Sequence, residues 1–165
     1  MIIGIMGESG SGKTTSLRNL DPKTTVIVDS DKKGLSWKGW KNDFNDKAKN
    51  YVKTDFPQVA LQALQKVDTE EKLKHVKVFV VDTLNGLMVA DEMRRSKEKG
   101  YDKWQDLAAA VYDIIDTALV MRDDLTIIFI VHSQTDRDDS GYTFTHMKTS
   151  GKKSETLNWQ SVSFH

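Results

Sequence analysis

An octapeptide near the start of the chain limits the available folds more than any other feature. Residues 7–14 read Gly-Glu-Ser-Gly-Ser-Gly-Lys-Thr, after the apolar run Ile2–Met6 and at the start of a helix predicted over Lys13–Leu20. Glycines let backbone N–H groups approach phosphate oxygens, and the positive end of a helix dipole favours an anion. The pattern G-x-x-x-x-G-K-[ST] between a strand and a helix is that of a phosphate-binding P-loop, the Walker A motif. It predicts a bound nucleoside triphosphate.

Each polar residue of this loop has a predicted role. The ammonium of Lys13 is expected to reach the β- and γ-phosphates, and the hydroxyl of Thr14 to ligate Mg²⁺. Thr15 is expected near the α-phosphate. The predicted nucleotide-binding residues are Gly7, Glu8, Ser9, Gly10, Ser11, Gly12, Lys13, Thr14 and Thr15.

Three polar residues at the ends of predicted strands complete the expected site. Asp82 ends the apolar run Val78–Asp82, a Walker B pattern, and is predicted to hold Mg²⁺ together with Thr14. Asp31 follows the strand Thr25–Asp29 and is the candidate that orients the attacking water, whereas Asp29 is read as structural. His132 follows the strand Leu125–Val131 and is expected over the nucleotide crevice. The predicted catalytic residues are Lys13, Asp31, Asp82 and His132, the alternatives being a strand-capping Asp, an exposed loop acid and a backbone-satisfied His.

Apolar runs and helical periodicity alternate along the chain, which predicts an α/β fold with a mainly parallel sheet. Residues 30–54 are read as mostly irregular. The remaining predicted elements are helices over Pro57–Val67, from Leu84 to about Gly100 and from Trp104 to Met121, a hairpin at Gly141 with the arm Tyr142–Met147, and a last strand Ser161–Phe164. A single domain over residues 1–165 is expected. The chain stops as that strand begins, so the domain is either truncated at its C-terminus or ends with a terminal strand.

Composition narrows the function classes. The 165 residues contain no cysteine, which excludes cysteine-based metal sites and nucleophiles. Formal net charge is zero, so nucleic-acid binding would need a local basic patch. No apolar run approaches the ~20 residues of a membrane helix. A soluble, cytoplasmic protein without membrane contact is expected.

The order of the motifs resembles a known family. The segments GESGSGKTT, VIVDSDKKGL, VFVVDTLNGL, KWQDLAAAVYDII and IIFIVHS, followed by Gly-Lys at 151–152, are similar to RecA-like P-loop ATPases encoded by phages. That AAA-type nucleotide-binding group includes single-strand annealing proteins. The resemblance implies a three-layer ASCE core with strand order 5-1-4-3-2, ATP and Mg²⁺ as cofactors, and ATP hydrolysis coupled to single-stranded DNA in phage recombination or repair, in the host cytoplasm.

The resemblance also assigns residues and partners. It implies a catalytic acid at Asp31, although the family more often has Glu there, and a His at position 132, where RecA-like proteins usually have Gln. If the site is completed across a homo-oligomer interface, Lys152 and Lys153 are the candidates; the alternative is that they form a solvated basic turn. DNA contact is expected after the third strand, where Arg94, Arg95, Lys97 and Lys99 lie near Tyr101 and Trp104, or else form a solvated helix face. The acidic run Asp136–Asp139 argues against phosphate contact after the fourth strand.

Other classes remain open. A small P-loop kinase would use the same loop, with Arg137 as the arginine of a lid, although that arginine stands among acids. A non-hydrolysing ATP-binding switch is the second alternative, because Thr83 follows Asp82 where many ATPases have glutamate. An ABC transporter ATPase is set aside, because the sequence has no LSGGQ-like signature.

Overall fold

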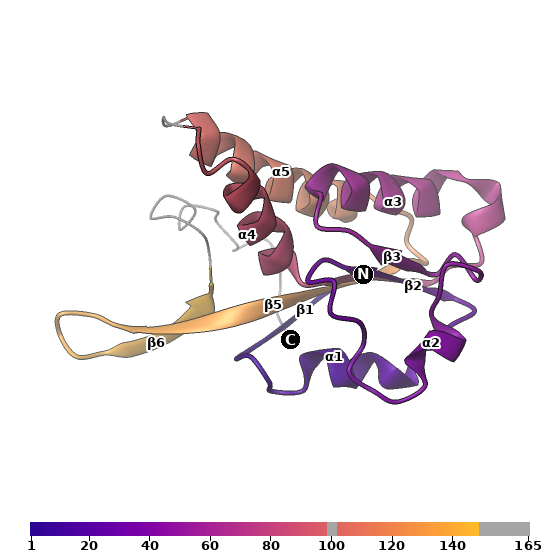
Figure 1. The fold of residues 1–165 in the computed structure, drawn as a ribbon, viewed down its shortest axis with the longest axis horizontal. Coiled ribbons are helices and arrows are strands. Elements are labelled where there is room, and N and C mark those ends of the chain that lie inside the picture. The colour runs from indigo at the N-terminus through magenta and orange to yellow at the C-terminus, as the bar shows by residue number, and fades with distance from the viewer. Residues whose placement is uncertain (99–101, 149–165) are drawn as a thin grey trace.

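A computed structural model describes residues 1–98 and 102–148 of the chain. Its centre is a sheet of five parallel strands in the order β1-β5-β4-β2-β3 (Figure 1). The strands are β1 (Ile2–Gly7), β2 (Thr25–Asp29), β3 (Tyr51–Lys53), β4 (Val78–Asp82) and β5 (Thr126–Arg137). A sixth strand, β6 (Thr143–Met147), pairs antiparallel with the outer half of β5.

This order confirms the predicted α/β class and the insertion of the fourth predicted strand between the Walker A and Walker B strands. In sequence-predicted numbering the four confirmed strands run 1-4-3-2. The fifth predicted strand, Ser161–Phe164, lies outside the described residues. β3 was not predicted and extends the sheet beyond β2, where Tyr51 pairs with Ile27.

Helices cover both faces of the sheet and make three layers (Figure 1). One face carries α3 (Pro57–Thr69), α4 (Leu84–Arg94) and α5 (Asp102–Leu119). The other carries α1 (Lys13–Ser16), continued by a 3₁₀ turn over Leu17–Asn19, and the short α2 (Trp40–Asp43). A second 3₁₀ turn, Glu71–Leu73, follows α3. The sheet lies between these two layers of helices, and both of its hydrophobic faces are therefore buried.

The core consists of two clusters, one on each face of the sheet. Alternate residues of a strand point to opposite faces. Accordingly Phe79 and Val81 of β4 pack with α3, α4 and α5, whereas Val80 between them packs with Leu17 and Phe44 on the other face. All three β4 residues are fully buried. Burial on both faces explains the unbroken apolar runs from which the strands were predicted.

Two sequence predictions need correction. Residues 30–54, read as mostly irregular, contain α2 and β3, which are held together by the tilted packing of Trp40 on Tyr51 at 4.8 Å between ring centroids. The fourth strand does not end at Val131, because β5 runs on to Arg137. His132 is therefore inside a strand rather than after it. The β5–β6 ribbon, whose β6 arm was predicted, projects from the body of the domain (Figure 1).

Candidate functional site

The glycine loop joins β1 to α1 through two left-handed backbone positions. Gly10 and Gly12 have φ of +81° and +89°, a region that residues with a Cβ seldom adopt. A Cβ on either would meet nothing within 4 Å, so backbone conformation, not space, requires glycine there. Gly7 differs, because its Cβ would lie 2.8 Å from the Ser11 hydroxyl. The local structure thus accounts for three glycines of the motif.

The side chain of Lys13 contacts the backbone of this loop. Its Nζ donates hydrogen bonds to the carbonyl oxygens of Gly7, at 2.7 Å, and Glu8, at 2.6 Å. The residue is only 8% exposed, and burial lowers the pKa of its ammonium, opposed by the charges of Asp82 and Asp31. A cavity of about 270 Å³ opens in front of it, lined by Ser9, Gly10, Gly12, Lys13, Thr14, Thr15, Asp31, Lys33, Ser36, Asp82, Thr83 and His132. The cavity brings together all four predicted catalytic residues.

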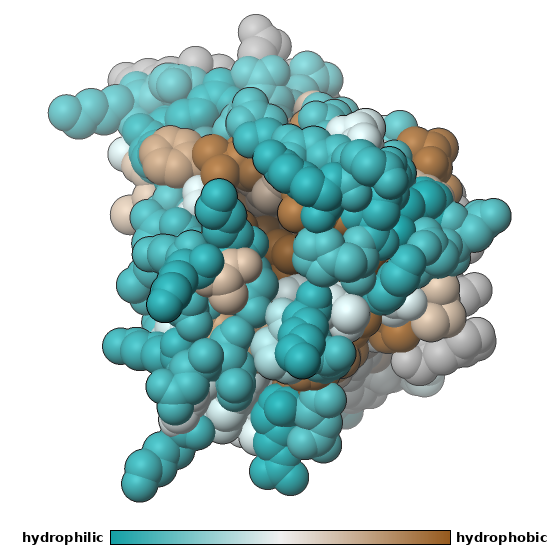
Figure 2. Space-filling view, turned by 90° about the vertical axis from the view of Figure 1, so that its right-hand side faces the viewer, coloured by the Kyte–Doolittle hydropathy of each residue, from teal (hydrophilic) through white to brown (hydrophobic). Residues whose placement is uncertain are grey.

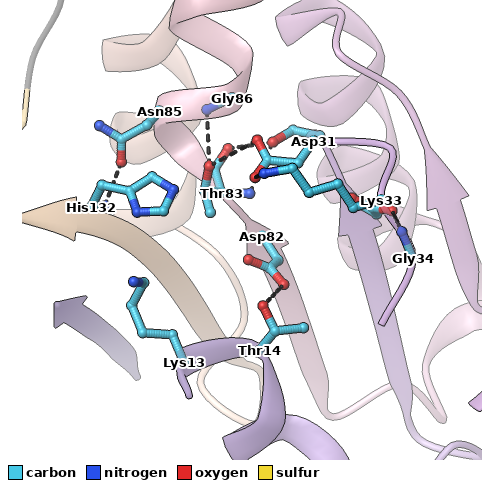
Figure 3. A network of polar contacts seen from close by, with 12 residues as sticks. Lys13, Thr14, Asp31, Lys33, Gly34, Asp82, Thr83, Asn85, Gly86 and His132 are labelled. Carbon is cyan, nitrogen blue, oxygen red and sulfur yellow. Dashed lines mark hydrogen bonds and ion pairs between the residues drawn. The ribbon is translucent and has the colours of Figure 1, made fainter. Parts of the chain in front are cut away.

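The hydroxyl of Thr14 donates a hydrogen bond to Oδ2 of Asp82 at 2.7 Å (Figure 3). Asp82 ends β4 and is buried, and this burial raises the pKa of its carboxyl, as do the nearby charges of Asp29 and Asp31. Within residues 1–98 and 102–148 no three His, Asp or Glu side chains form a metal cage. Mg²⁺ typically takes one or two protein ligands together with substrate phosphates and water. The Thr14–Asp82 pair fits that ion, which would also offset the buried charge.

The two acids at the end of β2 have separate surroundings. Asp29 is buried, and its Oδ2 accepts from the Tyr51 hydroxyl at 2.5 Å and from the Gly34 N–H at 2.8 Å. It therefore ties the loop after β2 to the sheet. Asp31 instead faces the cavity, and its Oδ2 pairs with Lys33 at 3.0 Å. This arrangement agrees with the structural interpretation of Asp29 and leaves Asp31 as the acid available to a ligand.

The first turn of α4 is fastened to the same region. Thr83 caps the helix by accepting from the Gly86 N–H at 2.9 Å. The Ser30 hydroxyl donates to the Thr83 carbonyl at 2.5 Å and accepts from the Thr83 N–H at 2.9 Å. A Cβ on Gly86 would overlap that hydroxyl and lie 2.5 Å from Oδ1 of Asp31. Glycine at 86 thus allows the Asp31 loop to pack against α4.

Asn85 is a site residue that sequence reasoning missed. It is buried, accepts from the His132 N–H at 2.6 Å, and donates to the carbonyl of Lys148. Figure 3 shows how it connects the start of α4 to the strand that carries His132. Burial and the charge of Lys13 lower the pKa of His132. The only available signal for Asn85 was an amide in the first turn of a helix that follows the Walker B strand.

A second cavity of about 510 Å³ adjoins the phosphate cavity and shares Ser9, Asp31, Lys33 and His132 with it. Lys32 and Lys148 add positive charge to its lining, and Val89 and Ala90 of α4 add apolar surface. Lys32 pairs with Asp55 at 2.8 Å. A ligand in this second cavity would lie next to the nucleotide site.

The other residues predicted to contact DNA or a second subunit either form ion pairs within the chain or lie outside the described residues. Arg94 stacks on Phe56 at 4.0 Å and pairs with Asp55 and Asp91, each at 3.3 Å. Arg95 pairs with Glu98 at 2.7 Å and with Asp106 at 2.8 Å. DNA contact through these arginines stays a prediction, and it would have to compete with carboxylates. Lys99, Tyr101, Lys152, Lys153 and the side chain of Trp104 lie outside the described residues.

The three-layer fold with a glycine loop between β1 and α1, and the Thr14–Asp82 pair beside it, define a P-loop NTPase. A family model described as AAA domain matches residues 1–161, and the chain belongs to this family. Membership supports nucleotide binding and ATPase activity at a general level. No curated protein matches the chain. Among the described helices, none combines the length and hydropathy that a bilayer span requires.

Proposed function

We propose that the protein is a Mg²⁺-dependent ATPase whose turnover responds to single-stranded DNA, acting in recombination or repair of phage DNA in the host cytoplasm. The observation that carries the ATPase part is the Thr14–Asp82 hydrogen bond of 2.7 Å beside Lys13 in one cavity. ATP is the default nucleotide, because the sequence shows no N/TKxD-like guanine motif.

The chain's own residues divide the work of hydrolysis. Backbone N–H groups of residues 7–14 and the Lys13 ammonium grip the phosphates, after Lys13 exchanges the Gly7 and Glu8 carbonyls for phosphate oxygens. Thr14 and Asp82 would hold Mg²⁺, which when bound offsets charge on the β- and γ-phosphates. Asp31 accepts a hydrogen bond from the attacking water and orients it. His132 lines the same opening from β5.

The ion pair between Lys33 and Asp31 supplies a route from DNA to hydrolysis. At 3.0 Å, Lys33 holds the carboxylate that is assigned to the water. Lys33 also lines the second cavity with Lys32 and Lys148, where a DNA phosphate would meet three lysines, two of which are paired with Asp31 and Asp55. A phosphate that takes Lys33 away releases Asp31 to the water. DNA would thereby raise turnover without touching the nucleotide.

Two lysine variants test this coupling. Lys33→Ala should raise turnover without DNA and remove most of its stimulation, because Asp31 is then unpaired in both conditions. Lys32→Ala is the matched control, since Lys32 pairs with Asp55 instead, and it should weaken DNA binding without raising basal turnover. Equal effects of the two variants would refute the coupling through Asp31. Steady-state phosphate release with and without an oligothymidylate measures both.

The ATPase assignment has its own test. Lys13→Ala should lower turnover by about 100-fold or more, because the lost charge acts in a preorganised site. Asp31→Asn should lower it while leaving nucleotide affinity unchanged. Full turnover in Lys13→Ala would refute the site, whereas absence of any DNA effect on the wild type would refute only the DNA part.

A P-loop kinase is the second candidate, favoured by the 510 Å³ cavity next to the phosphate site, which has room for a phosphoryl acceptor. The lid arginine expected for it, Arg137, instead donates to the Gly141 carbonyl at 3.0 Å in the β5–β6 turn. Phosphate transferred to a nucleoside or nucleotide, rather than released, would establish the kinase. Tight ATP binding without release or transfer would indicate the non-hydrolysing switch.

A further inference from the structure

A large cavity lies at the opposite end of the sheet from the glycine loop. Its volume is about 710 Å³, and it is bounded by the start of β2, the segment between α2 and β3, and the end of α3 with the turn that follows. Figure 2 looks onto this end of the molecule, where the strands begin, and shows a hollow with hydrophobic residues inside and hydrophilic residues around it. This cavity shares no lining residue with the phosphate cavity or with the cavity beside it.

Positive charge collects around the cavity. Lys23, Lys49, Lys66 and Lys72 line it together with His75, against the two carboxylates of Asp43 and Glu70. Lys72 pairs with Glu70 at 2.9 Å. The chain as a whole has zero formal charge, so this excess of lysines is a local feature. A cleft with one dominant sign of charge concentrates ligands of the opposite sign.

An apolar annex continues the cavity toward the edge of the sheet. This smaller space of about 250 Å³ is lined by Val52, Val59, Ala63 and Val67, and it shares Val26, Lys49, Lys66 and Leu73 with the larger cavity. Lys49 and Lys66 line both spaces, so these two residues lie at the border between the apolar annex and the charged cavity. A ligand that fits both must combine a flat or apolar part with an anionic group.

The walls are held in place before any ligand arrives. Asn50 is buried and donates to the carbonyls of Pro22, at 2.9 Å, and Asp43, at 2.8 Å, which fixes the α2–β3 segment against the start of β2. Lys49 has a left-handed backbone with φ of +55°, uncommon for a residue with a side chain. A preformed wall lowers the entropy lost on binding.

One buried group in this wall lacks a partner. Thr25 is 1% exposed, and within the described part of the chain its hydroxyl makes no hydrogen bond. Buried polar groups are nearly always paired, so an unpaired one needs an explanation. Thr25 lines the cavity, and a ligand there whose polar edge reached this buried hydroxyl would supply the missing bond.

We propose that this cavity binds a nucleoside phosphate, either free or as one unit of a nucleic-acid strand. The base occupies the apolar annex, the phosphate lies between Lys49 and Lys66, and Thr25 bonds a polar edge of the ligand. Base faces are apolar and phosphates prefer charge-assisted hydrogen bonds, which matches the two parts of the site. This site is distinct from the P-loop and does not depend on the function proposed above.

Histidine NMR separates the two sites, because His75 lines the distant cavity and His132 the phosphate cavity. Thymidine 5′-monophosphate and an oligothymidylate are titrated into the full chain carrying Lys13→Ala, which disables the P-loop. The His75 ring signals should shift in a saturable way with at least one of the two probes. A response to the mononucleotide identifies a free nucleotide as ligand, and a response to the oligonucleotide alone identifies a strand.

A charge-matched pair of double variants tests the lysines. Lys49→Gly with Lys66→Gln should weaken binding at least tenfold, and glycine suits the left-handed backbone at 49, so folding is preserved. The control, Lys47→Gln with Lys53→Gln, removes the same charge outside the cavity and should leave affinity within about twofold. The proposal would be overturned if the His75 signals moved with neither probe. It would also be overturned if both double variants lost the same affinity for the probe.

Discussion

Replacing Gly86 with alanine tests whether the packing of α4 against the Asp31 loop holds the site together. In an ordinary helix this change stabilises by up to about 1 kcal/mol. Here the new Cβ would overlap the Ser30 hydroxyl, which makes two hydrogen bonds to the Thr83 backbone. Displacing that hydroxyl loses both bonds, each about 1 kcal/mol, and leaves buried Thr83 groups unsatisfied. The net expectation is a loss of about 1–3 kcal/mol of unfolding free energy.

Turnover should fall as well. The same Cβ would lie 2.5 Å from Oδ1 of Asp31, so the carboxylate must move. A shift of the order of 1 Å in a positioning group costs about 100-fold in rate. Urea unfolding and steady-state ATP hydrolysis measure the two effects. A variant that is more stable than the wild type and fully active would show that helix propensity alone governs this position.

A double-mutant cycle identifies the cause. Ser30→Ala removes the hydroxyl that Gly86→Ala would strike, so the double variant should lose less than the sum of the single losses, by about 1–2 kcal/mol. Ala90→Gly on the same helix is the matched control, because it reports helix propensity without a clash. Strict additivity between positions 30 and 86 would contradict the steric explanation.

Three further results are expected. Asp82→Asn removes a charge that burial disfavours yet keeps an acceptor for Thr14. The unfolding free energy of the nucleotide-free protein should therefore rise by about 1 kcal/mol, while Mg²⁺-dependent turnover is lost. A lower melting temperature in scanning fluorimetry would contradict this. Tyr51→Phe leaves buried Asp29 with one donor fewer and should cost about 1–3 kcal/mol in a urea titration, so unchanged stability would count against it. Burial lowers the pKa of His132, so below about pH 6.5 the unfolded chain takes up its proton first and stability should fall. In His132→Gln, this fall in unfolding free energy below about pH 6.5 should be absent. Because the raised pKa of Asp82 changes the stability in the opposite direction, the quantity to compare is the difference in unfolding free energy between the wild type and His132→Gln.

Much of the fold was predictable because its signals are local. The glycine loop carries its own backbone requirements, and the runs of β2, β4 and the inner half of β5 are apolar throughout because both sheet faces are covered. The placement of Asp31 and Asp82 around one cavity followed from the rule that parallel strands end at a common edge. His132 joins them in the cavity although its strand runs on to Arg137. These inferences need only neighbouring residues and a topology.

The elements that were missed depend on partners distant in sequence. β3 is three residues long and exists through its pairing with β2 and the packing of Tyr51 on Trp40. The outer half of β5 reads as a polar loop, and only the ladder with β6, such as Ser133 opposite Met147, makes it a strand. Asn85 and the Lys33–Asp31 pair likewise become visible only when their partners are in place.

The continuity of β5 has a mechanical consequence. A single strand without interruption borders the glycine loop, where His132 pairs with Gly7, and then forms one arm of the projecting ribbon as far as Arg137. At about 3.3 Å per residue, the five steps from His132 to Arg137 span roughly 17 Å. If a strand of this length tilted by about 5° at its inner end, its free end would be displaced by about 1.5 Å. Any tilt of β5 beside the glycine loop would therefore be larger at the far tip, because no break in the strand separates the two.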